Sequence, residues 1–457
     1  MRKWFGQSGT QMLAAVALAA GLALPASAET LTDALIAAYR NSNLLEQNRA
    51  VLRAADEDVA VALSALRPTI ALGSDITSTN QRLDQLQASL SLSAQITVYD
   101  FGRNALGVEV AKESVLATRE ALVNVEQQVL LSAVSAYVNV RLTQDIVALR
   151  ESNVRLITQE LRAAQDRFEV GETTRTDVAQ AEARLAAARS QLIAAQGDLL
   201  IAREDYRLAV GRYPGNLAPL PRSPATARSL DEARAIASRT HPLIRQAQRL
   251  VTVGELNMQR TRAEMRPSIG ASASIGVNDE GDDSRSFSLN LDQTIYAGGR
   301  LSALFRQALA NRDESRAALL QTTLEIGQQV GEAWANVTVA NASIEATDRA
   351  IRANQTAFEG VRDEAALGAR TTLDVLDAEQ DLLSARTDRI SAEATRYIGV
   401  YSLLSAMGLL TVDHLKLGIP TYDPAAYYNA VRTAPATSAQ GKRLDRVLKS
   451  IGRSGTN

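Results

Sequence analysis

Residues 86–98, LQASLSLSAQITV, alternate between apolar and polar side chains along their whole length. A period of two is typical of a strand with one apolar face and one polar face. The same alternation returns in the second half of the chain, at Phe287, Leu289 and Leu291. Each alternating stretch is preceded by a second stretch that follows an Arg-Pro pair. We therefore predict four strands, at residues 69–79, 86–99, 268–278 and 285–297.

Most of the remaining chain is rich in Ala, Leu, Gln and Arg and has the pattern of helices. In residues 178–199, apolar side chains fall at alternating spacings of three and four, which is the seam of a coiled coil. The first helix is expected to end near Arg67, because a residue before proline resists helical geometry. We predict helices at residues 31–66, 102–168, 177–211, 230–265, 300–366 and 372–408. The second of these would be roughly 100 Å long, at about 1.5 Å per residue.

The chain contains two copies of one plan. VYDFGR at residues 98–103 matches IYAGGR at 295–300, and the turn GETTRTDV matches GARTTLDV. Gly171 and Gly368 begin these two turns, and the offset between them, 197 residues, also relates the first pair of motifs. Such an offset indicates an internal duplication. We predict a signal peptide at 1–28, a first repeat at 29–211, a proline-rich connector at 212–229, a second repeat at 230–410 and a partly disordered C-terminal periplasmic tail at 411–457.

The N-terminus has the features of an export signal. Arg2 and Lys3 precede an apolar run at residues 12–24, and small residues at 26–28 form a cleavage site. The apolar run is too short to be kept as a spanning helix. We expect the mature chain to begin at Glu29, beyond the inner membrane.

Composition and charge exclude several classes of function. A formal net charge of -2 argues against nucleic-acid binding, which needs clustered basic residues. The chain has no cysteine, so we expect neither a disulfide framework nor a thiol-linked lipid. The only histidines are His241 and His414, which cannot form a metal cluster, and we expect His241 to be a surface residue at a helix start. We find no catalytic constellation and expect neither enzyme activity nor a cofactor.

Strands of about 11 to 13 residues with one apolar face suit a tilted membrane strand. Four such strands cannot close by themselves, because open edges leave backbone groups unpaired in hydrocarbon. Two copies would supply eight strands and a filled interior, whereas three would supply twelve and a water-filled lumen. We therefore predict a mainly α-helical chain that contributes four strands to a shared outer-membrane β-barrel. The competing hypotheses are a pore-less periplasmic coiled-coil adaptor or scaffold, and an enzyme on a helical scaffold.

The duplicated plan, the YDFGR and YAGGR corners and the G-x-x-x-x-x-D-V turns together resemble the TolC family of outer-membrane export channels. The resemblance covers essentially the whole mature chain, and it implies a homotrimer with a twelve-stranded barrel and an α-helical tunnel across the periplasm. It also implies two partners, a periplasmic adaptor (membrane fusion) protein and an inner-membrane transporter of the ABC or proton-driven type. The resemblance does not distinguish between type I protein secretion and small-molecule efflux as the function of the channel. The absence of a lipidation cysteine favours the unlipidated branch, which includes secretion channels.

Asp374 and Asp377 are the candidate channel gate. They lie three residues apart, so both carboxylates face one side of a helix near its N-terminus. Acidic residues in a first turn also stabilise the helix by about 0.3 to 1 kcal/mol, which accounts for Asp177 and Asp374 better than for Asp377. The resemblance implies that three chains bring these carboxylates into rings that narrow the periplasmic entrance and favour cations.

The resemblance also implies links between neighbouring coils that hold the entrance shut. Arg370 matches the arginine of this network and Asp177 matches an acidic partner. Ala365 stands where the family has a tyrosine, so we expect the closed state to be held more loosely or by other residues. Gly171 and Gly368 match the turns at the helical tips that adaptors bind.

Overall fold

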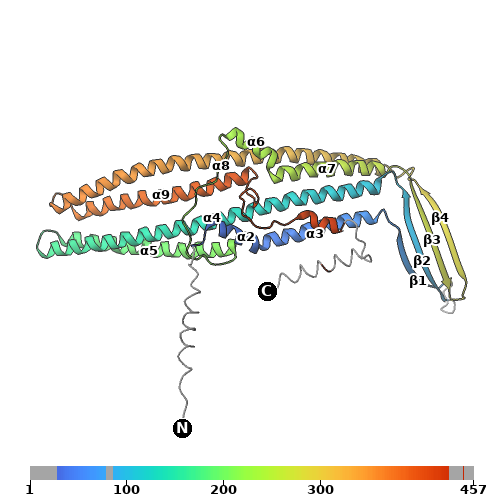
Figure 1. Cartoon of the computed structure of the whole chain (residues 1–457), viewed down its shortest axis with the longest axis horizontal. Coiled ribbons are helices and arrows are strands. Elements are labelled where there is room, and N and C mark those ends of the chain that lie inside the picture. Colours follow the sequence, from blue (N-terminus) through green and yellow to red (C-terminus); the bar gives the residue numbers. More distant parts are fainter. Residues whose placement is uncertain (1–27, 79–85, 432–445, 447–457) are drawn as a thin grey trace, which may run out of the picture.

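The computed structural model describes residues 28–78, 86–431 and 446. The predicted signal peptide up to residue 27, residue 79 of the first predicted strand, and most of the predicted tail beyond residue 431 lie outside the described residues. Long helices run side by side, with the strands at one end and helical turns at the other (Figure 1). The helices are α2 (Leu31–Asn41), α3 (Asn43–Ser64), α4 (Arg103–Glu169), α5 (Arg175–Val210), α6 (Leu230–Thr240), α7 (Pro242–Ala263), α8 (Arg300–Ala366), α9 (Thr372–Ala406) and α10 (Pro424–Val431).

The strands form one antiparallel sheet in the order β1-β2-β3-β4. They are β1 (Thr69–Ser78), β2 (Leu86–Tyr99), β3 (Ser268–Asn278) and β4 (Asp283–Asp292). Leu92 of β2 lies opposite Leu72 of β1 and Ile275 of β3. Because directly opposite residues point to the same side of a sheet, these apolar side chains share one face. The period of two therefore predicted the faces of the sheet correctly.

Strand β4 ends at Asp292, so the predicted end at residue 297 was wrong. Its last pair joins Asp292 to Ser268, which is the first residue of β3. Pro267 precedes Ser268 and has no N–H to donate, so β4 has no partner strand beyond this point. The chain leads from there into α8.

The helices predicted at 31–66 and 230–265 are each broken in two, so the prediction of single helices was also wrong. The breaks fall at Ser42 and His241, whose side chains cap the helices that follow. Each side chain accepts a hydrogen bond from a backbone N–H of the first turn, at 3.2 Å. His241 is 4% exposed, which corrects its expected surface position, and burial lowers its pKa to about 4.

Both breaks are joined to the end of a return helix. The Asn41 side chain donates a hydrogen bond to the Val210 carbonyl at 3.2 Å, at the end of α5. The Thr240 hydroxyl donates to the Met407 carbonyl at 2.6 Å, at the end of α9. Carbonyls in the last turn of a helix lack partners within the helix. Each break therefore satisfies a carbonyl that the corresponding return helix leaves open.

The core at mid-length contains three fully buried tyrosines, Tyr137, Tyr206 and Tyr397. The Tyr137 hydroxyl lies 2.9 Å from the Glu29 carbonyl and 2.7 Å from the Ala218 carbonyl. The Tyr206 hydroxyl donates to the Glu29 carboxylate at 2.7 Å. These contacts attach the first residue of the predicted mature chain and the proline-rich connector to α4 and α5.

The long helices form two pairs, α4 with α5 and α8 with α9 (Figure 1). The predicted seam of α5 is confirmed, since Ala181, Leu185, Ala188 and Ala195 are buried. Helix α9 also contacts α4, which joins the two pairs, and α10 packs on α3. Within the described ranges, no helix has an apolar stretch long enough to cross a membrane.

Candidate functional site

The turns at the helical tips lie at the end of the molecule opposite the sheet (Figure 1). Gly171 connects α4 to α5 with φ 82°, and Gly368 connects α8 to α9 with φ 78°. This left-handed backbone favours glycine, because other residues place Cβ against the following carbonyl. No atom lies within 4 Å of the position that a Cβ would take at either glycine. Backbone conformation alone therefore accounts for glycine here, and both turns are open to a partner.

Asp177 and Asp374 each close a capping box at the start of a return helix. One oxygen of Asp177 accepts from the Thr174 N–H at 3.0 Å and from its hydroxyl at 2.9 Å. Asp374 accepts from the N–H and the hydroxyl of Thr371, both at 2.9 Å. The hydrogen bond from the Thr371 N–H lowers the pKa of Asp374 most, and the hydrogen bond from the Thr371 hydroxyl lowers it further. Both carboxylates are thus occupied by the cap, and in Asp374 these hydrogen bonds favour the ionised form.

Asp377 is exposed and forms an ion pair with Arg184, which lies on α5. The pair joins the return helices α5 and α9 of the two repeats. Both side chains are more than a third exposed, so the pair contributes less than about 1 kcal/mol to stability. The sequence offered no signal for Arg184, because the two partners are 193 residues apart.

Arg370 does not meet Asp177 within one chain. Its Nε donates to Glu364 at 2.8 Å, across the same tip turn. Ala365 is 5% exposed and packs in the contact between α8 and α9 with Phe358. The expected link from Arg370 to Asp177 of a neighbouring chain stays a prediction.

A buried polar pair lies between the two helix pairs, where α9 packs on α4. The Asn153 amide donates to the Glu379 carboxylate at 2.6 Å, and the two residues are 6% and 5% exposed. Burial raises the pKa of Glu379 to about 7, with the Asn153 hydrogen bond acting in the opposite direction and the Glu160 charge raising it further. The contact between the two helix pairs therefore contains a group that titrates near neutral pH.

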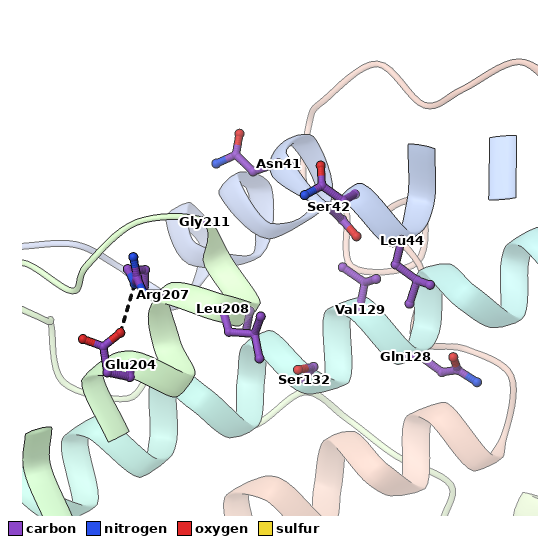
Figure 2. A pocket seen from close by; sticks show the side chains of 12 residues that line it. Asn41, Ser42, Leu44, Gln128, Val129, Ser132, Glu204, Arg207, Leu208 and Gly211 are labelled. Atoms are coloured by element: carbon purple, nitrogen blue, oxygen red, sulfur yellow. Dashed lines mark hydrogen bonds and ion pairs between the residues drawn. The ribbon is translucent and has the colours of Figure 1, made fainter. Parts of the chain in front are cut away.

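A groove of about 740 Å³ lies at mid-length, where α5 and α4 meet the break between α2 and α3 (Figure 2). Leu44, Val129 and Leu208 supply apolar parts of its walls, and Arg207 pairs with Glu204 at 3.0 Å on one side. Leu208 is 88% exposed, although it is apolar. We refer to this feature as the mid-helix groove.

The described residues contain no group of three or more His, Asp or Glu side chains that could hold a metal ion. The features present are instead open glycine turns, carboxylates at helix starts and an uncovered groove. These features are suited to contacts between protein chains and to electrostatic selection of ions.

Comparison with known proteins matches both repeats to a family model described as outer membrane efflux protein, over residues 35–212 and 235–409. The outer membrane efflux protein BepC of Brucella suis biovar 1 is 35% identical over 434 residues, which cover 92% of this chain and 95% of BepC. The outer membrane protein TolC of Escherichia coli K12 is 25% identical over 451 residues, which cover 93% of this chain and 91% of TolC. Among solved structures, CusC superposes with a TM-score of 0.76 at 21% identity, covering 84% of this chain and 92% of CusC.

Proposed function

The chain belongs to the outer membrane efflux protein family, and we propose that three copies of it form the exit duct of a tripartite export system. Its location is the outer membrane and its function is export. The hypotheses of a pore-less scaffold and of an enzyme do not suit a chain in which both repeats match an efflux-protein model. The observation that supports assembly into a trimer is that one chain leaves several apolar faces exposed.

The sheet has one such face and two open edges. Leu72, Phe287 and Leu289 are 71%, 76% and 65% exposed on its apolar side. Strands β1 and β4 are the edges, and neither has a second neighbour within the described residues. Backbone groups at an open edge are costly in lipid, which favours closure by other copies. Three copies of a four-stranded sheet close into a twelve-stranded barrel with a water-filled lumen.

The helices also have apolar side chains that are buried in one repeat and exposed at the corresponding positions of the other. In the second repeat, Tyr397 of α9 is 2% exposed and lies in the same cluster as Tyr137 of α4. The corresponding residue of the first repeat, 197 positions earlier, is Leu200 of α5, which is 64% exposed. Leu208, beside the mid-helix groove, lies two turns further along α5. Helix α8 corresponds to α4, and its Leu320 is 68% exposed.

These faces support a head-to-tail contact in which α8 of one copy covers α5 of the next copy, as α4 covers α9 within one chain. A head-to-tail contact forms a closed ring when its rotation divides a full turn. Three chains with two repeats each then make a continuous helical tunnel below the barrel, and the mid-helix groove is filled by the neighbouring copy.

In this ring, the carboxylates of Asp374 and Asp377 surround the periplasmic entrance. Because Asp374 caps its own helix, Asp377 is the carboxylate that acts most directly on passing ions, with Arg184 beside it. A ring of carboxylates favours cations. Arg370 and Asp177 contribute links between neighbouring copies that keep the entrance narrow.

The tips at Gly171 and Gly368 bind the periplasmic adaptor, which connects the duct to an inner-membrane transporter. Both turns are open and lie farthest from the sheet, which supports this assignment. The cargo, a small molecule or a secreted protein, is selected by the transporter and passes through the same duct.

Cross-linking tests the ring, because the chain has no native cysteine. Asn153 and Glu379 touch within one chain, and their counterparts 197 positions away are Ala350 and Glu182. A variant with both Ala350→Cys and Glu182→Cys, treated with a short bifunctional thiol reagent in membranes, is expected to give covalent trimers. Each single variant is the matched control and should remain a monomer on denaturing gels. Cross-linked dimers without trimers would overturn the ring.

A further inference from the structure

Arginines gather where the sheet joins the helices. Four segments cross this corner, at residues 64–69, 97–104, 259–268 and 291–302, and they contain six arginines but only three carboxylates. The arginines are Arg67, Arg103, Arg260, Arg262, Arg266 and Arg300. Within the described residues, none of the six forms an ion pair or donates a hydrogen bond from its side chain. The corner therefore presents a net positive charge that the chain itself does not neutralise.

One of these arginines is held by an aromatic pair. The guanidinium carbon of Arg266 lies 5.3 Å from the centre of the Phe101 ring, and the Phe101 ring lies 4.7 Å from that of Tyr99. Tyr99 is 52% exposed and Phe101 is 36% exposed. Contact with a ring face uses the flat side of a guanidinium and leaves its N–H groups available in the plane. We refer to these three residues as the aromatic-arginine corner.

A β-bulge brings Tyr99 to the apolar face of the sheet. Strand β2 pairs Thr97 with Gly270 and then Tyr99 with Ile269, so its register shifts by one residue between them. Ile269 also lies opposite Leu291 on the apolar face. Strict alternation would place Tyr99 on the polar face together with Thr97. The extra residue of the bulge moves the Tyr99 side chain to the apolar face. The aromatic-arginine corner thus continues the apolar face of the sheet at its helical end.

The backbone of Phe101 is unfavourable for a residue with a side chain. Phe101 has φ 53°, a region that bulky residues rarely adopt. The corresponding residue of the second repeat, 197 positions later, is Gly298, which has φ 58°. Glycine adopts this conformation without strain, so the turn itself does not require an aromatic ring. Strain that persists at one of two equivalent turns points to a role for the ring.

We propose that Arg266, positioned on the ring of Phe101, binds the phosphate of an anionic glycerophospholipid in the inner leaflet of the outer membrane. The inference rests on the proposed function, which places the apolar face of the sheet in the lipid. Guanidinium groups bind phosphate through parallel N–H···O hydrogen bonds, and the free N–H groups of Arg266 meet this requirement. Tyrosine and phenylalanine rings next to it suit the boundary between headgroups and acyl chains. The excess of arginine over carboxylate favours a lipid with a net negative charge.

Native mass spectrometry of the purified full-length mature protein tests this binding. Dioleoylphosphatidylglycerol is titrated into the detergent-solubilised protein, with dioleoylphosphatidylcholine as the zwitterionic comparison. Arg266→Gln is expected to weaken retention of phosphatidylglycerol roughly five-fold, the effect of one arginine near an anionic surface. Phe101→Gly is expected to weaken it as well while leaving assembly intact, because it introduces the residue that the second repeat uses. Arg67→Gln is the matched control, since Arg67 also precedes a proline at this corner but lies on no ring within the described residues.

Several outcomes would overturn the proposal. Equal losses in Arg266→Gln and Arg67→Gln would show that only the summed charge matters. Displacement of the lipid by millimolar inorganic phosphate would indicate a small-anion site, and equal retention of both lipids would remove the preference for anionic headgroups. Insertion into phosphatidylglycerol vesicles is measured in parallel. A wild-type protein that inserts and conducts while Arg266→Gln retains lipid normally would refute this inference alone, whereas failure of the wild type to insert would contradict the proposed function.

Discussion

Replacing Glu379 by glutamine is expected to strengthen the contact between α4 and α9 at neutral and alkaline pH but not at acid pH. Glu379 is 5% exposed and accepts a hydrogen bond from Asn153 at 2.6 Å, and burial raises its pKa from 4.5 to about 7. Folding therefore favours the protonated carboxyl. The free energy of unfolding of this contact is highest below pH 4.5, falls as the pH rises towards 7 and is constant above that value.

The size of the effect follows from the pKa shift. A shift from 4.5 to about 7 corresponds to about 3 kcal/mol between the two protonation states. Glutamine keeps the carbonyl that accepts from Asn153 but carries no charge, so Glu379→Gln removes this cost at pH 8. Hydrogen exchange of the α9 amides around residue 379 should slow by up to roughly two orders of magnitude at pH 8. At pH 4.5 the variant and the wild type should exchange alike.

The matched control is Asp381→Asn, which removes a carboxylate two residues away at an exposed position of the same helix. It should leave the exchange of α9 unchanged at both pH values. Equal exchange of Glu379→Gln and the wild type at pH 8 would refute the reasoning, because it would show that Glu379 is solvated and ionised at no cost.

Three further predictions concern the sheet, the gate and the tips. Ser91→Cys should react with a water-soluble thiol reagent in membranes and Leu92→Cys should not, since the two side chains lie on opposite faces of β2; equal labelling would contradict the barrel. Asp377→Ala should lower the cation preference of the channel in planar bilayers with little change in thermal stability, whereas Arg184→Ala should retain this preference. Unchanged selectivity in Asp377→Ala would show that this carboxylate forms only a surface ion pair and does not act on passing ions. Gly368→Val should strain the tip turn by roughly 1–2 kcal/mol, block export and leave trimers in the outer membrane; normal export would place adaptor binding elsewhere.

Periodic features of this fold could be predicted from the sequence, because they repeat one physical requirement many times. The alternation in β2 and the coiled-coil seam of α5 are of this kind. The break at Ser42 was missed, and His241 was expected at a helix start although residues 230–265 were predicted as one helix. Both breaks are joined to carbonyls at the ends of return helices far along the chain, which the sequence does not show. Both breaks had a local signal, since serine is a preferred N-cap residue and proline is common at the first position of a helix.

In the candidate site too, local features could be predicted from the sequence and long-range contacts could not. The capping role of Asp374 follows from a local pattern, Thr371 and an acidic residue three positions later, and the structure contains it. The Arg184–Asp377 pair and the Asn153–Glu379 pair join residues that are 193 and 226 positions apart, and no periodicity relates them. Contacts of this range depend on how the helix pairs pack, which a single sequence does not specify.

Differences between the repeats have a consequence for the proposed ring. Six contacts join neighbouring helix pairs around it, three within chains and three between chains. The contacts within chains contain Asn153 and Glu379, whereas Ala350 stands at the place of Asn153 in the contacts between chains and cannot accept or donate with its side chain. Deprotonation of Glu379 therefore weakens the three contacts within chains, whereas the three contacts between chains lack the amide that Asn153 supplies. A duplicated chain thus places three Glu379 carboxyls around the proposed ring, one at each contact within a chain.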